Sequence, residues 1–505
     1  MVIFNKIYSA LHNKRIERLI TNYSKYGDLI QSETLKKIIK KNYNTLYAQR
    51  YGLNKDSDYN EFSKKIPIIK YEDIKEYIDL TLKGFKNILT KEEIISFAKS
   101  AGTTSKSKYI PISKEFLKNC HYKGGKDVLS FYLANNPNSK IFKGKSLTLP
   151  GTFDLYNKNK FFIGDLSASL VYFLPLWAKI FKEPNKKLIF VQDFEQKISK
   201  IIKNTKNKNI VALFGSPVWF KVLLSFMINH FKINYISEIW PNLELFVHGG
   251  VSISPYFNEL KKLIAKEINY LEVYNASEGF FAFQNDLSYD DLLLCLDYDV
   301  FYEFIPLSDI NKNNYKVLNI NNIEENKIYS LVITTSNGLW RYAIGDLLKI
   351  TKINPIKIKL VGRTQLFLNT FGEELTIEQI ETALKETCNK TEAIVNEFCI
   401  HPVIISDSLN AGYHLWLIEF KKQPTNFKTF YENLDTVLKN INSDYEAKRY
   451  KNITLKEPKI IALKINTFYT WLKSKNKLGG QNKVPRIIYD ENIVKEIINI
   501  SNSLL

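Results

Sequence analysis

Cysteine is scarce in this chain, and its few copies are far apart. There are four cysteines in 505 residues, and no two of them form a Cys-x-x-Cys pair. None has a histidine at zinc-finger spacing, and the six histidines are equally scattered. Disulfide frameworks need many cysteines, and structural zinc sites need closely spaced ligands. The sequence therefore argues against both.

Long apolar runs are also missing. No uninterrupted run approaches the ~20 residues that a membrane-spanning helix needs. The most apolar region, residues 170–181, is short and contains Pro175 and Lys179. The N-terminus has neither the long apolar core nor the small-residue cleavage site of a secretory signal. We therefore expect a cytoplasmic protein with no membrane insertion.

Several common catalytic motifs do not occur. The chain has no Gly-x-Ser-x-Gly elbow, no His-Glu-x-x-His helix, no Gly-x-Gly-x-x-Gly turn and no Walker phosphate loop. Nucleophilic hydrolysis, zinc chemistry and dinucleotide binding of the usual kinds therefore have no support in the sequence.

Positive charge is abundant, with a formal net charge of +19. A concentrated basic stripe would favour nucleic-acid binding, because it releases counterions from a phosphate backbone. Here the lysines are spread along the whole chain among Asn, Ile, Tyr and Phe. Dispersed charge more often solvates a surface. A basic nucleic-acid-binding protein is therefore kept only as the less favoured alternative.

Apolar periodicity predicts helices in the first hundred residues and strand–turn–helix units from about residue 140. The predicted helices cover residues 7–26, 33–51, 73–82, 218–231 and a stretch from about 255, and the predicted strands cover residues 188–191, 210–214 and 243–247. Such alternation favours an α/β fold with mostly parallel strands, in which ligands bind beyond the carboxyl ends. Glycine turns at Gly215 and at Gly249-Gly250 stand at those ends.

The last part of the chain has a different pattern of predicted helices and strands. Strands at 328–335 and 339–350 flank Ser336-Asn337-Gly338, a hairpin signal. After Gly362-Arg363 the pattern becomes a smaller α+β region. Its predicted elements are a helix at 376–388, a strand at 414–420 and a helix at 427–440. We expect a large N-terminal α/β domain at residues 1–365 and a small α+β domain at residues 366–505, because one core does not serve so long a chain.

The most distinctive stretch is residues 97–111, where small, hydroxylated and basic residues surround one glycine. Glycine lets the backbone approach a polyphosphate, while N–H groups, hydroxyls and lysine bind it. The candidate phosphate-binding residues are Ser100, Gly102, Thr103, Thr104 and Lys108. The alternative is a solvated hairpin turn, since the same residue types are common in turns.

A second cluster, Tyr274-Asn275-Ala276-Ser277-Glu278-Gly279, follows the strand-like residues 271–273. A carboxylate just past a strand end can hold Mg²⁺ that bridges phosphates, which suits Glu278. Tyr274 could lie against a purine ring. The alternative is a helix N-terminus capped by Asn275 or Ser277, with Glu278 in the first turn.

Three further positions could bind a nucleotide or assist its chemistry. Asp346 follows Gly345, and its two carboxylate oxygens could accept hydrogen bonds from a ribose diol. Arg363 offers a planar fork for phosphate or ribose oxygens. Lys483 lies in the loop 479–486 and could stabilise negative charge at phosphorus. The alternatives are a turn aspartate, a boundary salt bridge and a solvated lysine.

In this order, the clusters resemble motifs of the Gretchen Hagen acyl-acid amido synthetases (the auxin-responsive promoter family), and the texture between them resembles the bacterial members. That family lies in the adenylate-forming superfamily. The family patterns are Ser-Ser-Gly-Thr-Thr/Ser, Tyr-x-x-Ser-Glu-Gly, Tyr-Arg-Tyr-x-x-Gly-Asp and Gln-x-Lys-x-Pro-Arg, which match residues 100–104, 274–279, 340–346 and 481–486. Ala101 replaces a usual serine, Trp340 replaces a tyrosine, and the first loop is about one residue short.

The resemblance implies an ATP- and Mg²⁺-dependent ligase. It would join a carboxylic acid to AMP with release of pyrophosphate, and then transfer the acyl group to an amine, typically of an amino acid. The implied phosphate-binding residues are Ser100, Thr103 and Thr104, and Glu278 would bind Mg²⁺. Asp346 would bind the ribose, Tyr274, Gly249 and Gly250 would lie near adenine, and Ser277 would also bind the nucleotide. Lys483, on a mobile C-terminal domain, would assist adenylation. An acyl-CoA ligase that uses the same first step is the close alternative. A further alternative, suggested by Ala101 and the short loop, is a member that binds nucleotide without turnover. The sequence specifies neither the acid, nor the acceptor, nor the oligomeric state.

Overall fold

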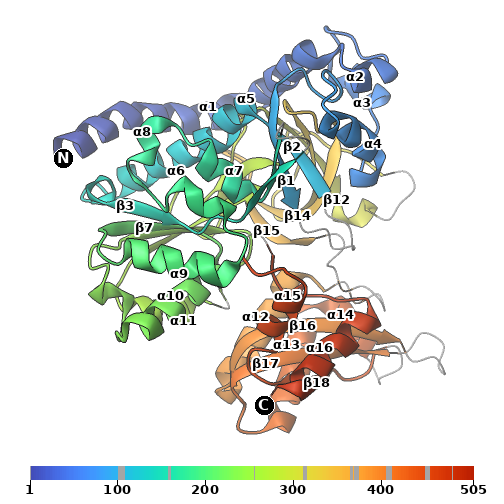
Figure 1. The fold of residues 1–505 in the computed structure, drawn as a ribbon. Coiled ribbons are helices and arrows are strands. Elements are labelled where there is room, and N and C mark those ends of the chain that lie inside the picture. Colours follow the sequence, from blue (N-terminus) through green and yellow to red (C-terminus); the bar gives the residue numbers. More distant parts are fainter. Residues whose placement is uncertain are drawn as a thin grey trace. The chain divides into compact units, whose positions relative to one another are not determined.

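The computed structural model describes residues 2–100, 108–156, 161–254, 256–310, 315–363, 368, 373, 375–404, 412–449, 455–479 and 482–504. The chain divides into two compact units (Figure 1). The N-terminal unit comprises Met1–Leu360 with Gly479–Gln481, and the C-terminal unit comprises Val361–Leu478 with Asn482–Leu505. The predicted α/β fold, with a large N-terminal and a smaller C-terminal part, is confirmed. The boundary expected at residues 365–366 lies outside the described residues.

Four helices open the chain: α1 (Val2–Asn42), α2 (Leu46–Arg50), α3 (Tyr59–Lys65) and α4 (Tyr71–Leu82). The two helices predicted at 7–26 and 33–51 are continuous across a kink at Tyr26 (φ −131°, ψ 24°). The second was predicted too long, because Thr45 interrupts it: its side chain accepts a hydrogen bond from the Ala48 N–H and starts α2. The predicted helix at 73–82 is confirmed as α4.

One mixed sheet forms the centre of the N-terminal unit. Its strands, in chain order, are β3 (Lys145–Thr148), β6 (Lys182–Glu183), β7 (Ile210–Gly215), β8 (Leu245–Gly249), β9 (Asn269–Ala276), β10 (Gly279–Phe283), β11 (Leu292–Leu294), β12 (Val300–Pro306), β13 (Ile328–Thr335), β14 (Tyr342–Lys352) and β15 (Lys357–Arg363). Across the sheet the order is β12-β13-β14-β15-β11-β10-β9-β8-β7-β3-β6.

The two halves of this sheet differ in strand direction. Strands β6, β3, β7, β8 and β9 are parallel neighbours. From β9 onward, antiparallel pairs such as β9–β10, β10–β11, β12–β13 and β13–β14 take over. The expectation of mostly parallel strands is therefore wrong for this half, because tight turns replace the helical crossovers that parallel strands require.

Helices cover both faces of the parallel half (Figure 1). Phe246 of β8 packs against Phe220 of α10 (Pro217–Phe231), with ring centroids 5.1 Å apart. Asn269 of β9 donates a hydrogen bond to the Tyr132 hydroxyl of α6 (Tyr122–Asn135). Helices α9 (Phe194–Thr205) and α11 (Phe257–Ile264) flank α10. The predicted helix at 218–231 and the strands at 210–214 and 243–247 are thus confirmed.

The predicted strand at 188–191 is wrong. Residues Lys186–Phe190 form a 3₁₀ turn, which Asn185 starts by accepting a hydrogen bond from the Lys187 N–H. Leu188 and Ile189 are buried, so their apolar character reflects core packing rather than a strand. An apolar run of this length cannot by itself distinguish the two.

A second, four-stranded sheet has the order β2-β1-β5-β4. It comprises β1 (Ile94–Ser100), β2 (Lys108–Ser113), β4 (Phe153–Tyr156) and β5 (Phe161–Gly164), and α7 (Leu166–Tyr172) and α8 (Leu176–Lys179) follow it in the chain. Strands β1 and β2 pair antiparallel, and their last pair is Ser100 with Lys108. The expected phosphate loop thus begins and ends on one rung of a hairpin.

The C-terminal unit packs helices on a three-stranded sheet of order β16-β17-β18. Its strands are β16 (Ile394–Ile404), β17 (Gly412–Lys422) and β18 (Lys459–Leu463), and its helices are α12 (Ile377–Thr391), α13 (Phe427–Ile441), α14 (Ser443–Arg449), α15 (Thr467–Ser474) and α16 (Glu491–Ser503). The predicted helices at 376–388 and 427–440 and the strand at 414–420 are confirmed.

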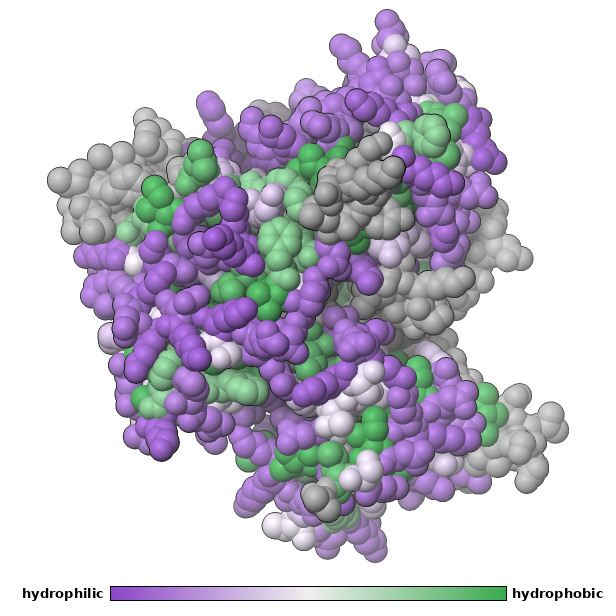
Figure 2. Space-filling view, in the orientation of Figure 1, coloured by the Kyte–Doolittle hydropathy of each residue, from purple (hydrophilic) through white to green (hydrophobic). Residues whose placement is uncertain are grey.

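Hydrophilic side chains dominate the face of the molecule shown in Figure 2, and hydrophobic ones occur there in small, separate groups. Throughout the described ranges, every helix is too short or too polar to cross a bilayer.

Candidate active site

Two of the predicted site residues meet in the N-terminal unit although they lie 72 positions apart in the chain. The hydroxyl of Tyr274 on β9 donates a hydrogen bond of 2.5 Å to Oδ2 of Asp346 on β14. Both residues are 5% exposed. A buried, hydrogen-bonded carboxylate has a fixed direction, so Asp346 is preorganised as an acceptor.

A β-bulge sets the direction of Asp346. Residue 330 of β13 pairs with residue 347 of β14, and the next pair joins residue 332 to residue 343, so β14 has two extra residues between these pairs. Gly345 lies in this bulge with a φ of +87°, which glycine adopts without strain. Bulges re-aim side chains and are common beside active sites. Asp346 therefore lies in a strand, and the alternative of an ordinary turn aspartate is wrong.

Glu278 and Ser277 form the turn between β9 and β10, where Ala276 pairs with Gly279. Ser277 is 2% exposed and Glu278 is 9% exposed. The alternative of a capped helix N-terminus is therefore wrong, because the chain reverses into a hairpin at this point. The turn places a nearly buried carboxylate at the carboxyl end of β9.

The neighbouring strand ends at the same edge of the sheet. Gly249 pairs with Val273, and a Cβ at Gly249 would collide with the Val273 carbonyl oxygen. A Cβ added to Gly250 would meet no atom within 4 Å, so this position borders open space. Ligands of such sheets bind beyond the carboxyl ends of the parallel strands. Gly249, Gly250 and Glu278 thus share the edge at which a nucleotide is expected.

Of the predicted phosphate-binding side chains, the structure describes that of Lys108. Gly102, Thr103 and Thr104 lie outside the described residues, as do the side chains of Ser100 and Arg363. Lys108 is half-buried, and its ammonium lies 5.7 Å from the centroid of the Tyr71 ring.

The remaining motif residues near Asp346 serve the fold. Arg341 is 5% exposed and binds both carboxylate oxygens of Glu303 at 2.9 Å. It also donates to the carbonyl oxygens of Ser63 and Ile66. Trp340 is fully buried, and its indole N–H donates to the Leu89 carbonyl. Both side chains are therefore buried and bound to other parts of the N-terminal unit.

In the C-terminal unit, Lys483 is exposed on a loop without regular structure. Arg486, three positions later, fixes this loop. It pairs with Glu381 and Glu397, donates to the Phe398 carbonyl and lies 4.4 Å above the Phe398 ring. Lys483 is thus an exposed cation on an anchored loop.

Comparison with known proteins establishes the family. Residues 16–268 match the GH3 family N-terminal domain, residues 293–363 the GH3 family central domain and residues 378–492 the GH3 family C-terminal domain. The chain belongs to the GH3 family. This confirms the family to which the four motifs pointed, while its bacterial type stays a prediction.

Curated GH3 relatives match over most of their length. A jasmonoyl–L-amino acid synthetase from Oryza sativa subsp. japonica is 23% identical over 92% of this chain and 92% of its own. A 4-substituted benzoates–glutamate ligase from Arabidopsis thaliana is 20% identical over 94% of this chain and 95% of its own.

Solved structures agree on the fold. An acyl acid amido synthetase in complex with 2,4-DB superposes with a TM-score of 0.79 at 18% identity, over 98% of this chain and 96% of that one. A 2-hydroxyisobutyryl-CoA ligase superposes with a TM-score of 0.60 at 12% identity, over 94% of this chain and 92% of that one. The GH3 chain therefore has the fold of adenylate-forming ligases.

The donor set of this GH3 chain fits magnesium better than zinc. Within the described ranges, no three His, Cys, Asp or Glu side chains gather closely enough to hold a metal by themselves. Mg²⁺ usually takes one or two carboxylates, and substrate phosphates and waters complete its shell. The single, nearly buried carboxylate of Glu278 is compatible with this mode of Mg²⁺ coordination.

Two buried histidines and one glutamate near this edge were missed from the sequence. Burial lowers the pKa of His121 to about 4 and that of His248 to about 4, so both are neutral at pH 7. Burial, reinforced by Asp290, raises the pKa of Glu272 on β9 to about 7. Lone histidines carry no sequence signal of their own. The position of His248 directly before Gly249-Gly250 was the only available clue.

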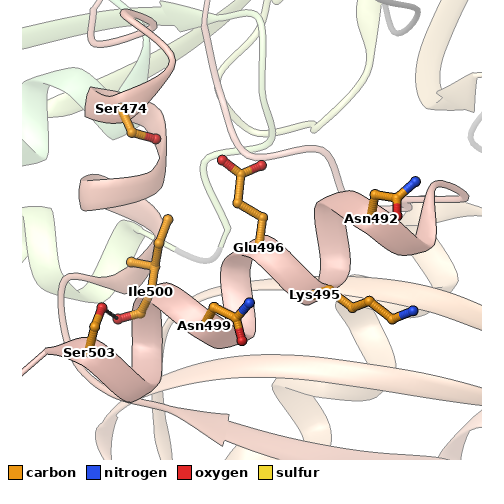
Figure 3. Close-up of a pocket in the computed structure, with 7 residues that line it drawn as sticks. All are labelled: Ser474, Asn492, Lys495, Glu496, Asn499, Ile500 and Ser503. Atoms are coloured by element: carbon orange, nitrogen blue, oxygen red, sulfur yellow. Dashed lines mark hydrogen bonds between the residues drawn. The ribbon is translucent and has the colours of Figure 1, made fainter.

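A separate groove of about 620 Å³ lies on the C-terminal unit between α15 and α16 (Figure 3). It is lined by Ser474, Asn492, Lys495, Glu496, Asn499, Ile500 and Ser503. Glu496 pairs with Lys475 at 2.7 Å. None of the four sequence motifs contributes a side chain to it, so the groove is not part of the candidate active site.

Proposed function

We propose that this GH3 chain is an ATP-dependent acyl-acid amido synthetase. In the first step, a carboxylate oxygen of the acid attacks the α-phosphorus of ATP, and pyrophosphate leaves. In the second, the amino group of an amino acid attacks the acyl carbonyl, an amide forms, and AMP and a proton leave. The contact between Tyr274 and Asp346, beside the turn that carries Glu278, is the observation that supports this function best.

The buried residues of the site would bind ATP and Mg²⁺ and would not take part in bond making or breaking. Asp346 accepts hydrogen bonds from the ribose hydroxyls, and the Tyr274 hydroxyl holds its carboxylate in place. Glu278 would hold Mg²⁺, which neutralises phosphate charge when it is bound. Ser100, Thr103, Thr104 and Lys108 would bind phosphate oxygens, with Arg363 as a further donor. Gly250 would leave room for adenine near Tyr274, and Gly249 would let β8 lie close to β9 beside it.

Lys483 is the proposed catalytic cation. Negative charge develops at phosphorus as the carboxylate attacks, and an ammonium group placed there lowers the barrier. An exposed lysine on an anchored loop suits a group that acts in one step and withdraws for the next. Large conformational steps of this kind are known in enzymes with lids or mobile domains.

The relatives suggest only a broad class for the carboxylic acid substrate. The relatives are named for jasmonate, indole-3-acetate and 4-substituted benzoates, which are all apolar acids. Four aromatic residues are candidates for an acyl pocket, with core packing as the alternative for most of them: Phe153, Tyr172, Trp177 and Trp219. Phe153 and Trp219 are buried in the core, at 1% and 3% exposure, and the side chain of Trp177 lies outside the described residues. Tyr172 is half-buried and remains a candidate. An enzyme that needs ATP and amino acids would work in the cytoplasm, where both are present.

Acid-dependent pyrophosphate release tests the first step. The purified full chain is incubated with ATP, Mg²⁺ and a panel of aromatic and aliphatic carboxylic acids. We expect release to rise well above the acid-free rate for at least one acid. Equal rates with and without every acid, in a folded protein that binds ATP, would contradict the proposal.

The close alternative is an acyl-CoA ligase, which the likeness in fold to 2-hydroxyisobutyryl-CoA ligase keeps open. Mass spectrometry of a reaction that contains both mixed amino acids and coenzyme A separates the two functions. An amide product supports the amido synthetase, and a thioester alone supports the alternative.

A further inference from the structure

A π-helical turn braces the hairpin that carries Glu278. Residues Leu117–His121 form this turn between α5 (Lys114–Phe116) and α6. Single π-turns inside α-helices are rare and often occur at functional sites. The wider turn lets the consecutive residues Cys120 and His121 both reach the β9–β10 hairpin.

The two contacts hold the same rung of the hairpin. Nδ1 of His121 lies 2.8 Å from Oδ1 of Asn275. The Phe280 N–H donates to Sγ of Cys120 at 3.1 Å, and the thiol donates in turn to the Phe280 carbonyl at 3.7 Å. Asn275 and Phe280 are paired across the hairpin. The second rung from the Ser277-Glu278 turn is therefore held from both strands.

Aromatic side chains also pack closely against the hairpin turn. The rings of Phe116 and His121 meet edge to face, with centroids 5.5 Å apart. A Cβ on Gly279 would lie 3.5 Å from the Phe116 ring and 2.7 Å from the Phe281 ring. The turn has little room to shift without displacing the segment that contains His121.

His121 is suited to holding a neighbour and not to transferring protons. It is 3% exposed, and at neutral pH it has one ring N–H, which Nδ1 donates to the Asn275 side-chain oxygen. Its Nε2 is enclosed, with no hydrogen-bond partner in the described part of the chain. A buried polar atom without a partner costs stability, so packing alone would favour an apolar side chain here.

We propose that His121 is a positioning residue for adenylation. Through Asn275 it fixes the hairpin turn that presents Glu278, and it fixes the adjacent Tyr274 that holds Asp346. This inference rests on the proposed function, because the turn matters only if Glu278 and Asp346 bind the nucleotide. The segment also continues directly from β2, the strand that follows the expected phosphate loop.

Two substitutions separate positioning from simple stability. His121→Ala removes the donor to Asn275. His121→Asn keeps one, because the amide nitrogen of asparagine lies near the place of Nδ1. Tyr132→Phe is the matched control, since it removes the 3.0 Å hydrogen bond between α6 and the far end of β9. The readouts are acid-dependent pyrophosphate release at varied ATP and Mg²⁺, and Tm.

We expect His121→Ala to lower kcat/KM for ATP by about 10- to 100-fold, because loss of an outer-shell partner has an effect of this size at metal sites. The Mg²⁺ concentration needed for half-maximal rate should also rise. His121→Asn should stay within about 3-fold of the wild type in kcat/KM. Tyr132→Phe should change Tm but not the dependence on ATP or Mg²⁺. Asn275→Ala should reproduce the His121→Ala defect, and the double variant should add little, because both remove one interaction.

Wild-type dependence on ATP and Mg²⁺ in both His121→Ala and Asn275→Ala would overturn the inference while leaving the proposed function intact. A defect in His121→Asn as large as in His121→Ala would also overturn it. If His121→Ala does not fold, Asn275→Ala and His121→Asn test the inference through the same dependence on ATP and Mg²⁺. A wild-type chain that is inactive with every acid would refute the proposed function and this inference with it.

Discussion

The two units of this GH3 chain present their motif residues in opposite ways. In the N-terminal unit, Tyr274 and Asp346 are 5% exposed and hydrogen-bonded to each other. In the C-terminal unit, Lys483 is exposed, and Arg486 is the residue that the fold holds tightly. The proposed binding groups are thus fixed before the ligand arrives, whereas the proposed catalytic charge is exposed on a loop that Arg486 anchors. The predictions below test this contrast.

The largest expected effect is on Lys483. Lys483→Ala should lower acid-dependent pyrophosphate release by about 100- to 1000-fold, the range typical for loss of one charge-stabilising group. The affinity for ATP should change by less than about 3-fold, because in the proposed function the buried residues bind the nucleotide. Steady-state kinetics and calorimetric titration with ATP measure the two quantities.

Lys477→Ala is the matched control, because Lys477 is another exposed lysine of the same unit. It should behave as the wild type does. If Lys483→Ala weakened ATP binding as strongly as it slowed release, the contrast between binding groups and catalytic charge would not hold.

The next effect concerns the fixed carboxylate. Asp346→Asn should raise KM for ATP by about 10- to 100-fold, because the uncharged amide is a poorer acceptor for two ribose hydroxyls. It should change kcat much less. Tyr274→Phe, which removes only the hydrogen bond to Asp346, should raise KM by about 3- to 10-fold. An effect of Tyr274→Phe larger than that of Asp346→Asn would show that Tyr274 has the main binding role.

Arg341 stands five positions before Asp346 and shows what the sequence could not reveal. Both lie in one family motif, yet Arg341 binds Glu303 and two backbone carbonyls, while Asp346 meets Tyr274. The motif predicted that the segment belongs to the functional site. It did not predict which of its residues bind the fold and which face the site, because the order of strands in the sheet determines their distant partners. The bulge at Gly345 was equally invisible, since it arises from the register with β13.

Local patterns predicted α1, α4, α10 and α11 and several strands of the N-terminal unit, but they missed other helices such as α6 and α9. Short apolar runs located β7 and β13, a longer apolar stretch located α10, and the Asn337-Gly338 turn located the β13–β14 hairpin. They failed at Lys186–Phe190, where a capped 3₁₀ turn buries an apolar run, and at the antiparallel half of the sheet. His121 had no signal, because its role depends on a neighbour 154 positions away.

The smallest effect is on the pH dependence of stability. The folded-state pKa of Glu272 is raised to about 7, so the folded state binds a proton that the unfolded state has already released above pH 5. Stability should therefore fall as pH rises from about 4.5 to 7. Glu272→Gln should remove this loss, which we expect to be on the order of 1 kcal/mol after screening by solvent and Lys359.

Chemical denaturation of the wild type and Glu272→Gln at pH 5 and pH 8 measures the difference. Glu267→Gln, at an exposed position of the same unit, is the control and should follow the wild type. Equal pH dependence of stability in the wild type and Glu272→Gln would show that Glu272 is already solvated in the folded chain. KM for ATP should be the same in all three proteins at pH 8.

The structure of the full chain with a stable acyl-adenylate analogue tests the central claim most directly. We predict the ribose hydroxyls within about 3.2 Å of the Asp346 carboxylate, with the Tyr274 hydroxyl still bound to it and Glu278 facing the phosphate position. An analogue bound away from this edge of the sheet, with the Tyr274–Asp346 pair unoccupied by ribose, would contradict the account.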